Sequence, residues 1–339
     1  MVMTDLKVVL RRYRAHAAVV LASAAFAMLF VASALGGFHQ PTPHELPLGV
    51  VAPASVTHDL EANLRAHHPG EFDLRPLSTA AEARAAIEHR RIDGALLVLP
   101  RRLNLLTAEA GGTAPTQAIT VAATAVAARS GRPLTATDIV PPGTDDSQAL
   151  SSFFAILGVL FPSLAAGVAA GHALRRTAVA SRIVVLVGAA GIVGLAAAGI
   201  ADSISGLGHY WAIAGIVALF SLAISAPTAA LGQVRPHLAA LCVLAFLIVG
   251  VPVSGGPANL AAFGPGFLRA LHSGLPLGVA VDAVRNTVYF HAGDTAGHLR
   301  VLTAYAAGGL AALGALVAVA RRRGGRVPNL GTVGAGYSS

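Results

Sequence analysis

The sequence predicts an α-helical membrane protein with six transmembrane helices, a small extracytoplasmic α/β domain between helices 1 and 2, and a broken, re-entrant helical segment before helix 6. Two observations lead to this fold class. Of the 339 residues, 55% are hydrophobic and only 12% are charged, whereas soluble domains carry about 25% charged residues. The charged residues are also spaced so that they leave six long apolar gaps. A charge at the centre of a bilayer costs roughly 2.5 to 3.5 kcal/mol, so these gaps mark segments that can lie in the hydrocarbon core.

The six gaps define the predicted spans. They lie between Arg14 and Glu45, Asp146 and Arg175, Arg182 and Asp202, Asp202 and Arg235, Arg235 and Arg269, and Arg300 and Arg321. Each gap holds about 20 apolar residues, which as a helix would cross the roughly 30 Å hydrocarbon core. Only a helix satisfies its own backbone hydrogen bonds within one such segment. We therefore predict helices over residues 15–37, 149–171, 183–202, 209–231, 237–255 and 300–320, the last five of them forming one domain over 149–320.

Two segments have an alternative interpretation. The first apolar segment could be a cleaved signal peptide, but its apolar core is longer than the 7 to 15 residues or so that signals use, which favours a span. A seventh gap, from Glu109 to Arg129, contains Pro115, Gln117 and several threonines. We predict that this segment is a helix of a soluble domain near residues 114–129.

The arginine distribution predicts the orientation. Residues 38–148 hold nine Arg and twelve Asp or Glu, so this segment is net negative. The two terminal pieces and the loops around Arg175 and Arg235 together hold twelve basic residues and one acid, Asp5. By the positive-inside rule, both termini are cytoplasmic, with an amphipathic start over 1–14 and a basic tail over 321–339, and 38–148 lies outside the plasma membrane. The net charge of +8 then follows from topology and gives no support for a nucleic-acid partner.

Residues 46–110 have the alternating pattern of a small α/β domain. Strands are expected at 46–53, 72–77 and 93–100, and helices at 55–68 and 79–91. The second helix has a start signal, because Ser78 or Thr79 can cap its free amides and Glu82 completes a capping box. The linker 139–146 then leads into the second span.

The outer segment 256–299 contains two short apolar helices, which break at Ser273-Gly274 and at Pro276. Neither is long enough to cross the bilayer, so we expect both to dip into the membrane or to lie on its outer surface. Asp282 and Arg285 share one face of the second helix and can pair. This pair is either a surface ion pair or part of an outer gate, for which the candidate residues are Pro276, Asp282, Arg285 and Tyr289.

The order of these elements resembles the ABC-2 type transporter permeases, and in particular their YhgE/Pip-like branch. Three stretches carry the resemblance: STAAEARAAIEHRRIDGALLVLPRRL, IVPPGTDDSQALSSFFAILGVLFPSLAAG and LHSGLPLGVAVDAVRNTVYF. It implies the permease subunit of an exporter for an amphipathic or lipid-like compound, paired with itself or with a sister permease. It also implies a separate ATPase subunit, since Lys7 is followed by Val8 and cannot belong to a phosphate-binding loop. The candidate residues for coupling to that ATPase are Arg175, Arg176, Arg11 and Arg12.

Other functions have less support in the sequence. A receptor or secretion scaffold, whose outer domain binds a partner, remains the alternative. A membrane-embedded enzyme would need titratable groups clustered at one depth, which the sequence does not predict, and we expect no catalytic residue, cofactor or metal site. The glycines at 188, 191 and 194, like those at 167 and 171, are interpreted as helix-packing positions. Asp202 is expected at the membrane interface, and Cys242 in apolar packing.

Overall fold

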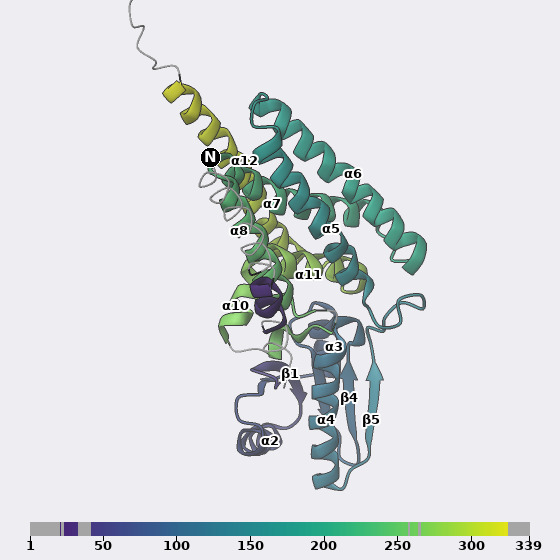
Figure 1. Cartoon of the computed structure of the whole chain (residues 1–339). Coiled ribbons are helices and arrows are strands. Elements are labelled where there is room, and N and C mark those ends of the chain that lie inside the picture. Colours follow the sequence, from purple (N-terminus) through teal and green to yellow (C-terminus); the bar gives the residue numbers. More distant parts are fainter. Residues whose placement is uncertain (1–20, 22–23, 33–41, 257, 264–265, 325–339) are drawn as a thin grey trace, which may run out of the picture.

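The computed structural model describes residues 21, 24–32, 42–256, 258–263 and 266–324, and combines a sheet domain with a helical bundle (Figure 1). Most of the first predicted span, Arg11 and Arg12, and most of the basic tail lie outside the described residues. Within that span, residues 24–32 are helical.

Five of the described helical segments are long and apolar enough to cross a membrane. The bundle begins with α5 (Ser151–Val168), which continues into the π-helical turn η2 (Ala169–Ala173). The others are α6 (Val179–Ser205), α7 (Tyr210–Val234), the run α8 (Pro236–Ala245), η3 (Phe246–Gly250) and α9 (Val251–Val253), and α12 (Thr295–Gly324). Together with the small sheet, they confirm a mostly helical membrane protein that carries an α/β region.

The α/β domain is a five-stranded sheet in the order β2-β1-β3-β4-β5. Its strands are β1 (Leu46–Val51), β2 (Phe72–Pro76), β3 (Gly94–Val98), β4 (Leu103–Thr107) and β5 (Leu134–Asp138). Only the β3–β4 pair is antiparallel. The helices α2 (Ala54–His67), α3 (Ala80–Glu88) and α4 (Thr113–Ser130) make the connections that parallel strands need. The sequence predicted the first three strands and these helices, but β4 and β5 are short and were not predicted.

The capping residues of α3 hold its first turn as the sequence predicted. Thr79 Oγ1 accepts a hydrogen bond from the Glu82 amide at 3.1 Å. The Glu82 carboxylate in turn accepts from the amide of Ser78 at 2.8 Å, one residue earlier than in the usual capping box.

Helices cover both faces of the sheet, and one of these faces meets the bundle. Helices α2 and α4 bury the first face, with Leu60, Leu64 and Ile119 in its core. The second face packs against α3, and its apolar cluster also includes Phe290. Because Phe290 follows a helix of the outer segment, the domain shares part of its core with the membrane-associated part of the chain.

Helix α7 is the most buried of the five apolar segments, and glycines on three neighbours let their backbones approach it. A Cβ built on Gly167, Gly171 or Gly194 would lie 2.5–2.6 Å from a carbonyl oxygen of α7, and one on Gly309 of α12 would lie 2.5 Å from the Pro227 nitrogen. These positions confirm the predicted packing role of the small residues. Gly188 and Gly191 have no such neighbour within 4 Å, so Gly194 is the packing position of its segment.

Candidate functional site

The segment before α12 contains two helices, α10 (Gly266–Gly274) and α11 (Pro276–Tyr289), which meet at Leu275. Every residue of α11 from Pro276 to Thr287 is buried. The helix contacts α5, α7 and α12, and the Phe290 that follows it packs into the sheet domain. The interpretation of the Asp282–Arg285 pair as a surface ion pair is therefore wrong, because both side chains are buried.

Asp282 is the centre of a buried polar cluster between α11 and the α/β domain. Arg90, in the turn after α3, donates from Nη1 to Asp282 Oδ1 at 3.1 Å and to Asn286 Oδ1 at 2.8 Å. Its guanidinium carbon also lies 5.2 Å from the centre of the Phe290 ring. We call Arg90, His272, Asp282, Arg285 and Asn286 the Asp282 cluster. It joins the α/β domain to α11 across 192 residues of sequence.

His272, on α10, contacts two hydrogen-bond acceptors. Its Nε2 lies 2.8 Å from Asp282 Oδ2, and its Nδ1 lies 3.0 Å from the Val253 carbonyl oxygen. A carbonyl oxygen and an ionised carboxylate can only accept, so both ring nitrogens must carry a proton. Burial alone would lower the pKa of His272, but Asp282 and the Val253 carbonyl raise it above its ordinary value. The geometry and the shift both indicate an imidazolium.

The charges of the cluster keep Asp282 ionised. Burial would raise the pKa of its carboxyl, but Arg90, His272 and Arg285 together hold that pKa well below the ordinary value. Arg285 is 1% exposed, and its Nη1 lies 3.8 Å from Asp282 Oδ1. Burial lowers the pKa of Arg285 to about 10, against the opposing effect of Asp282, so this side chain is cationic at neutral pH.

A second contact ties the end of α11 to the start of α5. Tyr289 donates its hydroxyl to Asp146 Oδ2 at 2.8 Å. Asp146 also accepts from the amides of Leu150 at 2.9 Å and Ser151 at 3.2 Å, so it caps the first apolar helix of the bundle. Burial and the hydrogen bond to Asp146 raise the pKa of Tyr289. The α/β domain, α11 and α5 are thus connected through polar contacts.

The structure distributes the four predicted gate residues along the whole of α11. Asp282 and Arg285 come together in the cluster, Tyr289 pairs with Asp146, and Pro276 is the buried first residue of the helix. Sequence reasoning missed Arg90 and His272, because each meets Asp282 from a different element.

The predicted coupling residues Arg175 and Arg176 are exposed, on the turn between η2 and α6. This turn lies at the end of the bundle away from the sheet (Figure 1). Nearby, the buried Arg182 donates to Gln233 Oε1 at 2.6 Å and to the Arg175 carbonyl oxygen. Arg182 therefore fixes the turn against the end of α7, and leaves the side chains of Arg175 and Arg176 at the surface.

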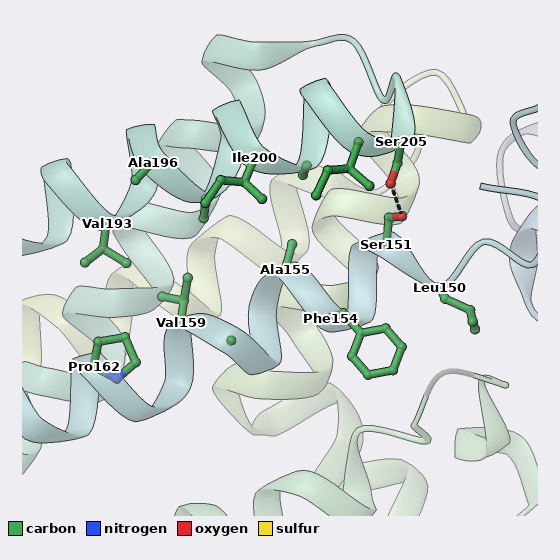
Figure 2. A pocket seen from close by; sticks show the side chains of 14 residues that line it. Leu150, Ser151, Phe154, Ala155, Val159, Pro162, Val193, Ala196, Ile200 and Ser205 are labelled. Atoms are coloured by element: carbon green, nitrogen blue, oxygen red, sulfur yellow. Dashed lines mark hydrogen bonds between the residues drawn. The ribbon is translucent and has the colours of Figure 1, made fainter. Parts of the chain in front are cut away.

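An apolar groove of about 500 Å³ lies between α5 and α6. Figure 2 shows Phe154, Val159 and Pro162 on one side and Val193, Ala196 and Ile200 on the other. Its polar lining residues are Ser151 and Ser205, whose hydroxyls are 2.6 Å apart at one end (Figure 2). The groove is thus apolar along its length and polar at the end near the α/β domain.

These features define a multi-pass helical membrane protein whose α/β domain is fixed to its bundle by buried charges. Comparison of the chain with protein-family models, with curated proteins and with solved structures gives no match.

The protonation of His272 predicts that the contact between the α/β domain and α11 becomes less stable as the pH rises. Asp282 and Arg90 act directly on the charge of His272. The other titratable groups that approach Asp282 are Arg285 on α11, His298 on α12 and, beside α3, Asp93. Because the pKa of His272 is raised in the folded protein, its stabilising effect is complete below the unfolded value of about 6.5 and is lost as the pH rises through the folded value. We expect the midpoint of thermal unfolding to fall over that range.

Thermal unfolding of the purified protein between pH 5.5 and 9 tests this expectation. His272→Gln should remove most of the pH dependence, whereas His58→Gln, at an exposed histidine of α2, should keep it. An unchanged pH profile in His272→Gln would show that another group is responsible.

Proposed function

We propose that this chain is the permease subunit of an ABC-2 type exporter, which moves an amphipathic or lipid-like compound across the plasma membrane. The Asp282 cluster is the observation that carries the proposal. It connects a folded domain to a helix buried among α5, α7 and α12, so movement within the bundle would reach that domain. In this arrangement residues 38–148 face the outside, both termini are cytoplasmic, and the permease acts as a homodimer or with a sister chain.

The energy for transport would come from a separate subunit. Lys7 is the only lysine of the chain, and no Gly-rich loop ending in Lys-Ser or Lys-Thr exists in the sequence. We place the contact with the ATPase at the turn that carries Arg175 and Arg176, since these side chains are exposed at the end of the bundle away from the sheet. The cytoplasmic residues Arg11 and Arg12 are assigned to the same contact.

Isolation of the native complex tests this function. We expect an ATPase subunit to copurify in stoichiometric amount. Arg175→Ala with Arg176→Ala should weaken its binding roughly tenfold, because two exposed ion pairs of up to about 1 kcal/mol each would be lost. The matched control is Arg101→Ala with Arg102→Ala, an exposed arginine pair in the turn between β3 and β4. Purification without any nucleotide-hydrolysing subunit would contradict the exporter function.

A receptor or secretion scaffold is the second candidate, and a polar cavity in the α/β domain favours it. This cavity has a volume of about 700 Å³ and lies beside the edge strand β2. Its lining includes the charged residues Glu45, Glu61, Arg65, Asp73, Arg75 and Arg269. Under this alternative, crosslinking from β2 would capture a protein partner, and no ATPase would be found in the complex.

A further inference from the structure

We propose that the groove between α5 and α6 binds a single-chain amphiphile with a cationic head, with its alkyl chain along the groove and its head beside Ser151 and Ser205. As a statement about the exported substrate, this inference rests on the proposed function. Binding itself can be tested without transport.

The shape of the groove selects one extended chain. Along α5 its lining runs from Ser151 to Pro162, a distance of about 17 Å at 1.5 Å per residue. This length matches an alkyl chain of roughly 12 to 14 carbons, whose C–C bonds of about 1.5 Å zigzag along the chain axis. Phe154 and Ile200 border the groove and are 54% and 60% exposed. A chain in the groove would therefore cover apolar surface on both helices.

Two carboxylates near the polar end of the groove favour a ligand with a positively charged head group. Asp202 lies one turn before Ser205, and its Oδ1 accepts from the amide of Gly208 at 2.8 Å. Asp145 lies beside the end of α6, with its Oδ2 3.5 Å from the place where a Cβ on Gly206 would be. Neither carboxylate belongs to an ion pair within the part of the chain that the structure describes. An ammonium head would neutralise them, whereas the phosphate of an anionic lipid would be repelled.

The serine pair supplies the third feature of the site. Ser151 begins α5 and Ser205 ends α6, and their hydrogen bond closes the end of the groove (Figure 2). Ser205 is 8% exposed and Ser151 is half-buried. The groove thus combines an apolar channel, a hydroxyl pair at its end and two carboxylates around that end.

Photolabelling in nanodiscs of zwitterionic lipid tests the site. The probe is dodecyltrimethylammonium with a diazirine in its chain, and the comparison probe has the same chain with a sulfonate head. We expect the cationic probe to label residues 154–162 and 193–204, about fivefold more strongly than the sulfonate probe. Asp145→Asn with Asp202→Asn should bring the two probes close to equality.

A blocked variant and its control separate the groove from general lipid exposure. Ala196→Phe places a large ring in the groove at an exposed position and should abolish the labelling. Val184→Phe, at a position of α6 that is 69% exposed and outside the groove, should leave it unchanged. Equal labelling by both probes, or labelling spread over Val184 and Ile192, would overturn the proposal. Selective labelling in a protein that never copurifies with an ATPase would keep the binding site and remove the exporter function.

Discussion

Replacement of Asp282 by Ala is expected to lower the free energy of unfolding by about 3–5 kcal/mol and to loosen the α/β domain from the bundle. Asp282 is 8% exposed and is the common carboxylate partner of Arg90, His272 and Arg285. Its removal would leave three cationic groups buried without that partner. Arg285 would be the most affected, because it is 1% exposed and has no other ion pair within the described residues.

Hydrogen exchange and thermal unfolding measure the two parts of this prediction. The Asp282→Ala variant should exchange faster around the turn that carries Arg90 and at the end of α11, and should unfold at a lower temperature. Asp59→Ala, which removes an exposed carboxylate from α2, is the control and should have little effect. If the turn at Arg90 stayed protected in Asp282→Ala, then Phe290 and the apolar cluster, rather than the charges, would hold the domain in place.

The five long apolar helices were predictable because the physics that defines them is local. A gap of about 20 strongly apolar residues without charge identifies a helix in lipid whatever its neighbours are. The equally long gap before Arg129 is polar enough to be told apart, and it forms α4 of the sheet domain. The capped start of α3 is local as well, because Thr79 and Glu82 are three residues apart. The strands β4 and β5 were missed, and for β5 the reason is that its central side chains lie in solvent. Without a buried face, β5 has no apolar alternation to detect.

The candidate site was predictable only in part, because its contacts are long-range. The spacing of Asp282 and Arg285 indicated a pair on one helix, and the structure contains that pair. The second cationic partner of Asp282 is Arg90, which is 192 residues away in the sequence and lies in a turn with a positive φ of 53°. His272 contacts two acceptors, and one of them is the Val253 carbonyl oxygen. Its position is set by the course of η3 and α9. No local pattern encodes either arrangement.

Helix α11 connects the α/β domain with the start of α5. Asp282 near its middle holds the α/β domain, while Tyr289 at its end holds Asp146 and through it the first turn of α5. Helix α5 begins with Ser151, which also forms the polar end of the groove. A shift of α11 would therefore act on the α/β domain and on the mouth of the groove together. This connection is why the Asp282 variant should also alter labelling at the groove end.

Alanine at Gly194 and alanine at Gly188 are expected to change stability in opposite directions, although both are glycines of α6. A Cβ at Gly194 would lie 2.5 Å from the Ala214 carbonyl oxygen and 2.9 Å from the Ala218 Cβ, so α6 and α7 must separate. Overpacking of this kind costs about 1–3 kcal/mol, and more where the obstacle is backbone. A Cβ at Gly188 meets nothing within 4 Å. There the substitution should stabilise the helix by up to about 1 kcal/mol, because alanine loses less backbone entropy than glycine.

Thermal unfolding of the two variants is compared in one detergent. The readout is the temperature at which half of the monodisperse protein is lost. The midpoint should fall for Gly194→Ala and should stay the same or rise for Gly188→Ala. A fall in both variants would mean that a second surface covers Gly188, as a partner subunit packed on α6 would. A midpoint unchanged in Gly194→Ala would mean that α6 does not approach α7 closely. Since α6 is one wall of the groove, Gly194→Ala should also widen the groove. The cationic probe should then label it more weakly.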